Sequence, residues 1–480
     1  MDMISALRPV PKIGLVLNSI GAFNPGAKDD SERALRAYYD GLLKAGRIDR
    51  DSLLIGRIFG PQEALDAADR LAAARVDLVV IANVAFPNGQ VYLTLATHPH
   101  LARIPLAVIA EPEPTGKEWA TNAWCGVIMN SHVARQIGRP IAVLPGPFAA
   151  PAFDRNFGRL LRVAAAIRFL RRDLLVRFGD APSGFHSATG DQLAFAKVFG
   201  TRVETVDLTA VMDAFKTGRA AGYRGEVRFT DGDVRKTAAS LTRGRKVEVD
   251  AAMLERGARL YHAYRAIILA NGYTSAAFRC WPENNESYIG ISACLAMGLL
   301  LSEGEISAAA CESDWPTAVV QTIGTLLSDR PAACLDWVNY TGGSSIVQLG
   351  HCGMGICGLM AEGEDSIVVH PVIRQEGKTM GPVLAGQFAY GPKTGLCLTR
   401  DTDGGGGFSV LAFKGENSPQ SAKGMISSAA DVVVADPDRL NRLVLEGGFP
   451  HHLAVAVGDI SEEVRMLCEF LGVRYVSPDA

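Results

Sequence analysis

The chain has 480 residues, of which 48% are hydrophobic and 21% are charged, proportions that suit a folded protein of roughly two to four domains. A formal net charge of −3 leaves no basic footprint, so we expect no nucleic-acid partner. Nine scattered cysteines, no secretory signal and no apolar run long enough to span a bilayer favour a cytoplasmic protein that contacts no membrane.

The first third of the chain alternates strand-like and helix-like segments. Strands are predicted at residues 12–18, 52–59, 77–85, 104–110 and 140–144, with helices at 31–46 and 62–74. Apolar strands separated by helices indicate a parallel sheet with both faces covered, which we assign to a first domain over residues 1–156. No G-x-G-x-x-G motif follows the first strand, which disfavours a dehydrogenase.

The rest of the chain divides at about residue 340. A basic helix at 157–172 precedes a second α/β region, with strands at 173–178, 203–208, 275–280, 305–311 and 332–335 and helices at 250–271 and 285–303. Glycine then becomes frequent and short β-like runs follow, typical of an antiparallel sheet or barrel. The predicted fold class is α/β: two doubly wound parallel-sheet domains (1–156 and 157–340) followed by a β-rich, barrel-like C-terminal domain (341–480).

Two carboxylates stand out at predicted strand ends. Glu312 ends the strand at 305–311, and Ser313 or Asp314 can cap the helix that follows. Asp336 lies near the end of the next strand, so a right-handed βαβ unit would bring Glu312 and Asp336 to one sheet edge, about 4.8 Å apart if the strands are neighbours. Carboxylates that close repel each other unless a proton or a cation lies between them, which favours a divalent ion. Either carboxylate could instead be a helix cap or a surface charge.

Histidines complete the candidate ligand set. His451 and His452 are adjacent at a predicted strand start, and adjacent residues point to opposite faces, so at most one should face a given site. If the strand begins at His451, His452 shares a face with the small residues Ala454 and Ala456, which leaves room for a ligand. We therefore expect His452 to bind the ion.

The sequence around His351 also admits a zinc interpretation. This histidine is followed directly by Cys352, and Cys357 lies six residues beyond it. Without a second Cys pair, the pattern indicates zinc only weakly.

Four motifs resemble the L-fucose isomerase and L-arabinose isomerase superfamily: FRCWPEN (278–284), ACESDWPTAVV (310–320), CLDWVNY (334–340) and PHHLAVAVGD (450–459). The resemblance implies that Glu312, Asp336 and His452 bind a metal, with Glu312 and Asp336 also catalytic. It further implies that Trp281, Glu283, His351 and His451 contact the substrate, and His351 also resembles the additional histidine ligand of the arabinose type. Members of this superfamily are typically homo-oligomers, here expected as a hexamer or a trimer-based assembly, and use Mn²⁺ or a similar ion such as Co²⁺ or Mg²⁺.

The activity that the resemblance implies is a metal-dependent aldose–ketose isomerisation of an open-chain sugar through a cis-enediolate. The substrate class stays open among pentoses, deoxyhexoses and modified hexoses, neutral or anionic. Alternatives are a metal-dependent sugar epimerase or aldolase, which needs the same charge stabilisation, and a non-catalytic sugar-binding module.

Overall fold

The computed structural model of the chain describes residues 9–20, 25–113, 116, 119–280, 282, 289–340, 342–361, 368–370, 374–375, 378–379, 381–401, 407–418 and 428–479. It divides into two compact units, one formed by Pro9–Arg168 with Met466–Leu471 and the other containing Phe169–Arg465 and Gly472–Ala480. The three-domain division expected from the sequence stays a prediction. Among these residues, no helix is both long and apolar enough to cross a membrane.

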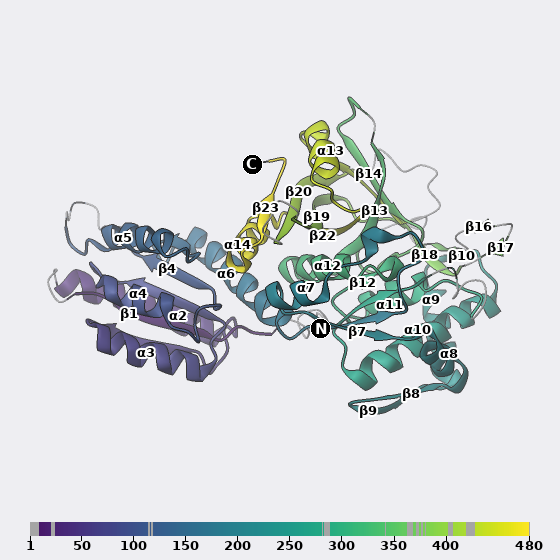
Figure 1. The fold of residues 1–480 in the computed structure, drawn as a ribbon, viewed down its shortest axis with the longest axis horizontal. Coiled ribbons are helices and arrows are strands. Elements are labelled where there is room, and N and C mark those ends of the chain that lie inside the picture. The colour runs from purple at the N-terminus through teal and green to yellow at the C-terminus, as the bar shows by residue number, and fades with distance from the viewer. Residues whose placement is uncertain are drawn as a thin grey trace. The chain divides into compact units, whose positions relative to one another are not determined.

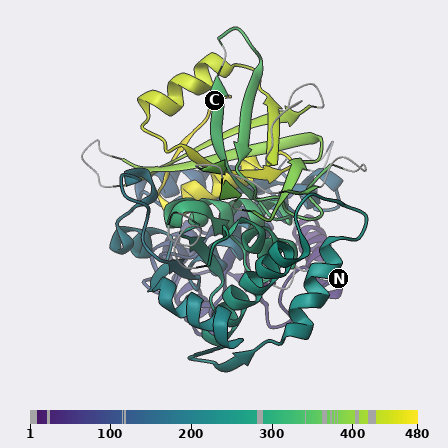
Figure 2. The same cartoon turned by 90° about the vertical axis from the view of Figure 1, so that its right-hand side faces the viewer.

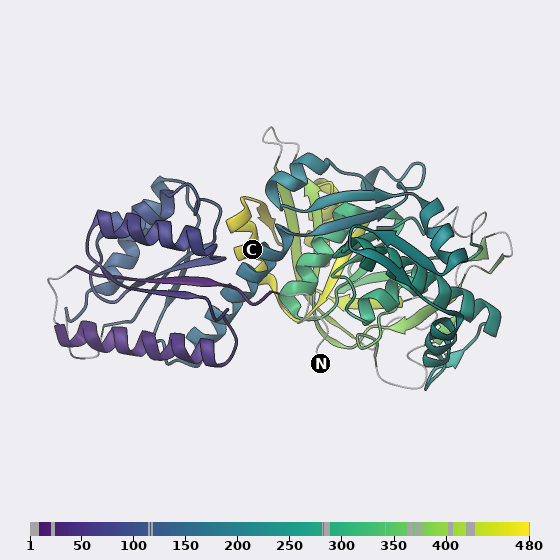
Figure 3. The same cartoon turned by 90° about the horizontal axis from the view of Figure 1, so that it is seen from below.

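The unit that contains residues 9–168 is built on a five-stranded parallel sheet in the order β2-β1-β3-β4-β5 (Figures 1 and 3). Its strands are β1 (Ile13–Asn18), β2 (Leu53–Ile58), β3 (Leu78–Asn83), β4 (Leu106–Ala110) and β5 (Ala142–Pro145). Helices α2 (Pro25–Lys44) and α6 (Pro151–Leu170) pack on one face, and α3 (Pro61–Ala74), α4 (Gly89–Thr97) and α5 (Ala123–Gln136) on the other. The central strands are buried along their whole length, as their continuous apolar runs predict.

The other unit begins with a four-stranded parallel sheet in the order β12-β11-β6-β7. These strands are β6 (Leu174–Phe178), β7 (Arg202–Val206), β11 (Ser275–Phe278) and the short β12 (Ala309–Ala310). Its helices are α7 (Gln192–Val198), α8 (Leu208–Thr217), α9 (Asp231–Leu241), α10 (Ala251–Asn271), α11 (Cys294–Ser302) and α12 (Trp315–Ser328), and β8 (Arg219–Gly222) forms a hairpin with β9 (Gly225–Arg228). The helix expected at 285–303 is shorter, because α11 begins only at Cys294.

A second sheet of the same unit curls into a barrel (Figure 2). Six of its strands close a ring in the order β21-β14-β13-β22-β19-β20, because β20 pairs again with β21. They are β13 (Ala333–Tyr340), β14 (Ile346–His351), β19 (Gly391–Arg400), β20 (Phe408–Asn417), β21 (Ser428–Val433) and β22 (His452–Val457).

The ring is extended by β23 (Arg474–Val476) beside β20 and by β18 (Val383–Gln387), β15 (Val368–His370) and β10 (Lys246–Val247) beyond β21. A separate pair is formed by β16 (Arg374–Gln375) and β17 (Lys378–Thr379), and the remaining helices are α13 (Pro437–Glu446) and α14 (Ser461–Leu471). The predicted fold class, two parallel-sheet α/β parts followed by a β-rich barrel, is confirmed.

The expected βαβ unit around Glu312 and Asp336 is wrong in one respect. Strand β12 belongs to the four-stranded sheet, whereas β13 belongs to the barrel, so the two strands are not neighbours. The reason is the helix between them: every residue of α12 except Ser328 is buried, so it must be covered on all sides. Helix α12 therefore lies between the two sheets, in contact with β11 and β12 on one side and β19 and β22 on the other.

Candidate active site

Three of the predicted ligands meet where the two sheets of this unit face each other across the start of α12. Asp336 on β13 lies opposite His452 on β22 in the antiparallel register. His452 Nε2 is 3.3 Å from Asp336 Oδ1 and 3.6 Å from Glu312 Oε2. The His452 side chain is 1% exposed, Glu312 15% and Asp336 37%, so the group opens to solvent on the Asp336 side.

An unusual turn presents Glu312. Glu312 and Ser313 have φ values of 55° and 60°, in the left-handed region that costs a non-glycine residue about 1–3 kcal/mol. The turn is held from both ends: Ser313 Oγ donates to the carbonyl of Gly179 at 2.7 Å, and Asp314 accepts the backbone N–H of Thr317 at 2.9 Å. Backbone strain that the surroundings hold in place is typical of functional sites.

Asp314 orients His452, a role that the sequence analysis missed. Asp314 Oδ2 lies 2.8 Å from His452 Nδ1 and also accepts the Thr317 hydroxyl at 2.8 Å, and Asp314 and His452 are both buried. Because the carboxylate is the acceptor, Nδ1 carries the hydrogen and Nε2 presents its lone pair to Glu312 and Asp336. This carboxylate–imidazole arrangement is the one that usually supports a metal-binding histidine.

The expectation that His451 and His452 face opposite ways is wrong. Strand β22 begins at His452, so His451 precedes the alternating register, and the two ring centroids are 4.1 Å apart. His451 Nε2 is 3.4 Å from Glu312 Oε2, and its Nδ1 is 3.0 Å from the hydroxyl of Ser187. The hydrogen bond with Glu312 raises the pKa of His451 above its ordinary value. Both histidines therefore belong to the site.

The small-residue face of β22 has a different use from the one expected. Ala454 and Ala456 are fully buried, and a Cβ placed on Gly324 of α12 would lie 3.4 Å from the Ala456 Cβ. The alanines thus let α12 approach the strand closely, which brings Asp314 at the helix start to His452. They leave no room for a ligand.

His351 lies at the end of β14 among cysteines. Its Nδ1 is 3.7 Å from Cys352 Sγ, and although burial lowers the pKa of His351, the neighbouring Cys352 raises it to about 10. Cys357 is turned elsewhere, since its sulfur accepts from Arg245 at 3.4 Å. Trp281 and Glu283 lie outside the described residues.

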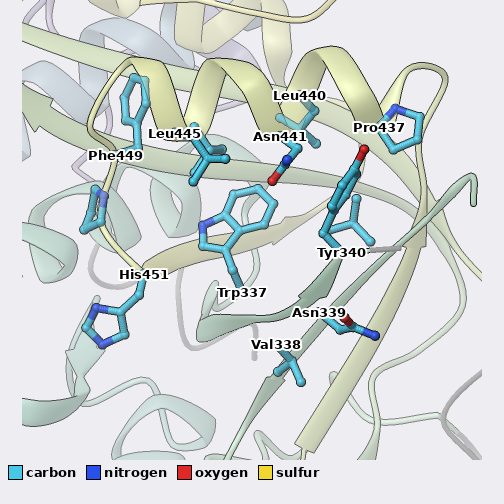
Figure 4. A pocket seen from close by; sticks show the side chains of 13 residues that line it. Trp337, Val338, Asn339, Tyr340, Pro437, Leu440, Asn441, Leu445, Phe449 and His451 are labelled. Carbon is cyan, nitrogen blue, oxygen red and sulfur yellow. The ribbon is translucent and has the colours of Figure 1, made fainter. Parts of the chain in front are cut away.

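Two pockets flank His451. One, of about 390 Å³, is lined by Trp337, Asn339, Tyr340 and Asn441 as well as His451, and Figure 4 shows the Trp337 indole under helix α13 with His451 at one end. Trp337 directly follows Asp336, but nothing in its spacing marked it in the sequence as a site residue.

The other pocket, of about 440 Å³, is lined by Ser187, Arg400 and Phe195 among others, and it shares Phe449 and Pro450 with the first. Ser187 carried no signal in the sequence, because a lone serine in a loop has no distinguishing spacing.

No family model matches the chain. The chain is 28% identical over 423 residues to the sulfoquinovose isomerase of Alkalicoccus urumqiensis, covering 87% of this chain and 89% of that protein. It is 25% identical over 399 residues to the sulfoquinovose isomerase of Clostridium sp. (strain MSTE9), covering 82% and 84%. Both relatives are isomerases by name, as the sequence led us to expect, and neither name mentions fucose or arabinose.

Proposed function

We propose that this chain is an aldose–ketose isomerase that acts on an open-chain sulfonated sugar and uses a divalent cation held by Glu312, Asp336 and His452. The observation that carries the proposal is the convergence of two carboxylates on the Nε2 atom of an imidazole whose Nδ1 is fixed by Asp314. The names of the two relatives support both the isomerase class and the sulfonated substrate. Membership of the fucose and arabinose isomerase superfamily, assembly into a homo-oligomer and the cytoplasmic location stay predictions.

The donor set fits a cation such as Mn²⁺. Two carboxylate oxygens and one imidazole nitrogen suit manganese, cobalt or magnesium, and a cation with bonds of about 2.1 Å separates adjacent ligand atoms by about 3 Å. The spacings of 3.3 and 3.6 Å from His452 Nε2 are close to that value, and donor atoms of Glu312, His451 and His452 all lie within 4.8 Å of one another. When bound, such an ion would act as a Lewis acid on the sugar oxygens.

The side chains of the site would carry out the proton transfer. A carboxylate takes the proton from C2 of the aldose and returns it to C1, by way of a cis-enediolate, while the hydroxyl proton of O2 passes to O1. Glu312 is best held for the transfer between the carbons because its backbone is fixed on both sides. His451 orients Glu312, since its Nε2 faces Glu312 Oε2 at 3.4 Å and its Nδ1 faces the Ser187 hydroxyl at 3.0 Å.

The pockets supply the means to bind the rest of the sugar. Trp337 offers an aromatic face beside Asn339 and Asn441, the combination that commonly binds the apolar and hydroxylated faces of a sugar ring or chain. On the other side of His451, Arg400 pairs with Asp191 at 3.1 Å, and its remaining N–H groups offer a site for an anionic substituent such as a sulfonate.

The test is an isomerisation assay with manganese and a substrate panel that pairs sulfoquinovose with glucose, which lacks the sulfonate, and adds L-fucose and L-arabinose. We expect turnover of the sulfonated sugar. Glu312→Gln should lower turnover by roughly 10²–10⁴-fold, the usual contribution of general acid–base catalysis, with an unchanged circular dichroism spectrum. Glu255→Gln, at an exposed position of α10, is the matched control and should be neutral. Turnover by Glu312→Gln within a few-fold of wild type would remove Glu312 from the mechanism.

A further inference from the structure

A second group of metal-binding side chains lies in the same unit, apart from Glu312, Asp336 and His452. It consists of four cysteines and one histidine drawn from separate segments: Cys280 after β11, Cys294 at the start of α11, Cys311 after β12, His351 at the end of β14, and Cys352 next to it. Because these residues span more than seventy positions, the sequence showed only the His351–Cys352 pair.

The donor atoms are close enough to share one ion. Cys294 Sγ lies 3.9 Å from Cys352 Sγ, and Cys352 Sγ lies 3.7 Å from His351 Nδ1. The three donor atoms all lie within 4.8 Å of one another. Cys311 is not one of these three, and its Sγ lies 3.1 Å from Cys280 Sγ. Tetrahedral zinc, with bonds of about 2.3 Å to sulfur and about 2.0–2.1 Å to nitrogen, requires separations of about 3.8 Å between sulfurs and about 3.5 Å between sulfur and nitrogen. The Cys294–Cys352 distance of 3.9 Å and the Cys352–His351 distance of 3.7 Å are close to these requirements.

We propose that Cys294, Cys352 and His351 form a zinc site and that the Cys311 thiol turns from Cys280 to the ion as the fourth ligand. Three thiolates and one imidazole are a standard closed ligand set for structural zinc, and thiolates select zinc over the manganese or magnesium expected at the carboxylates. The site does not depend on the proposed isomerase activity.

Two neighbouring contacts fit the assignment. Cys280 Sγ lies 3.1 Å from Cys311 Sγ, so its thiol can donate to the bound sulfur, as the surroundings of zinc thiolates commonly do. The N–H of Gly353 points to His351 Nδ1 at 3.4 Å, beyond the usual range for an N–H···O or N–H···N bond, so a metal ion can take its place.

A zinc ion at this site would also help to hold the turn at Glu312 in place. Cys311 immediately precedes Glu312, whose backbone is left-handed, and Cys294 and Cys352 would tie that turn to α11 and to the barrel. Free buried cysteines that merely fill the core would not need a histidine nitrogen at metal-binding distance among them.

The test uses the wild-type protein first. Protein purified without chelator should contain about one zinc ion per chain by elemental analysis, and the cobalt-exchanged protein should show the intense near-ultraviolet absorption of thiolate-to-cobalt charge transfer. The Glu312, Asp336 and His452 group has no sulfur and cannot give that band, so the result is independent of the proposed function. Protein without zinc and without the cobalt band would overturn the proposal.

Variants then locate the ligands. Cys294→Ser and Cys352→Ser should each reduce zinc content at least tenfold and abolish the cobalt band, whereas Cys357→Ser, the cysteine that the sequence pattern offered, should change neither. A thiol count under denaturing, non-reducing conditions gives an independent check. Nine free thiols are expected once zinc is removed, and seven, with a Cys280–Cys311 disulfide found by mass spectrometry, would refute the site because Cys311 could not be a ligand. Zinc retained in both serine variants would refute it as well.

Discussion

Replacing Asp314 by Asn tests whether the orientation of His452 controls the site. The substitution keeps the size of the side chain and one oxygen, so it can still cap α12 through the N–H of Thr317. It removes the acceptor that faces His452 Nδ1 at 2.8 Å. An amide nitrogen at that position would donate to Nδ1, which moves the ring hydrogen to Nε2 and removes the lone pair that faces Glu312 and Asp336.

The magnitude follows from the contacts. Asn and Asp are equally good N-caps, so the helix end itself should lose little. A hydrogen bond to a charged partner contributes about 1.5–3 kcal/mol, which is the expected loss in the free energy of unfolding because Asp314 and His452 are both buried. Loss of the group that orients a metal-binding histidine typically costs about 10–100-fold in metal affinity or activity.

The assay is a manganese titration by calorimetry, with urea unfolding and turnover measured on the same samples. The control is Asp250→Asn, because Asp250 caps α10 by accepting the N–H of Met253 at 2.7 Å and is exposed, away from any histidine of the site. We expect the control to bind manganese normally. If Asp314→Asn binds manganese and turns over substrate as the wild type does, the orientation of His452 does not depend on Asp314.

Four further outcomes are expected. A chelator should abolish isomerisation, and manganese, cobalt or magnesium but not calcium should restore it, because calcium prefers more oxygen ligands; full activity without metal would contradict the metal role. Titrations of manganese should show a larger loss in His452→Ala than in His451→Ala, and the reverse order would exchange their roles. Arg400→Gln should raise KM for the sulfonated sugar at least tenfold with kcat little changed, and an unchanged KM would place the sulfonate elsewhere. Burial raises the pKa of Asp173 from 3.8 to about 6, so the folded state binds its proton more tightly and loses up to roughly 3 kcal/mol as pH rises from about 4 to 7. Urea unfolding of Asp173→Asn should lack this decline, and equal declines in both proteins would assign it to another group.

The fold was readable from the sequence where a segment's environment is uniform. The strands at residues 12–18 and 77–85 are mostly apolar because helices cover both faces of their sheet, and such runs admit few other structures. The path of β13 was not readable. The start of β13 continues the α/β pattern of the preceding residues. However, α12 is buried on all sides, so a second sheet must cover it, and β13 belongs to that sheet.

The candidate site was only partly predictable for a similar reason. Glu312, Asp336 and His452 could be picked out because Glu312 and Asp336 each follow an apolar run and His452 precedes one. The contact of Asp314 with His452 joins a helix cap to a strand start and could not be predicted from the sequence, which offered Ser313 or Asp314 only as a helix cap. The error over His451 came from a strand assumed to start one residue early, which is within the usual uncertainty of an element boundary.

The division of the site between two sheets affects how the protein loses activity when it begins to unfold. Asp336 and His452 belong to the barrel, whereas Glu312 follows a strand of the four-stranded sheet, and α12 lies between. A small separation of these layers would pull the carboxylates apart while each sheet kept its own backbone hydrogen bonds. Mild heat or denaturant should therefore abolish turnover before the circular dichroism signals of helices and strands are lost. Turnover should recover quickly on cooling, because the two sheets need only return to contact.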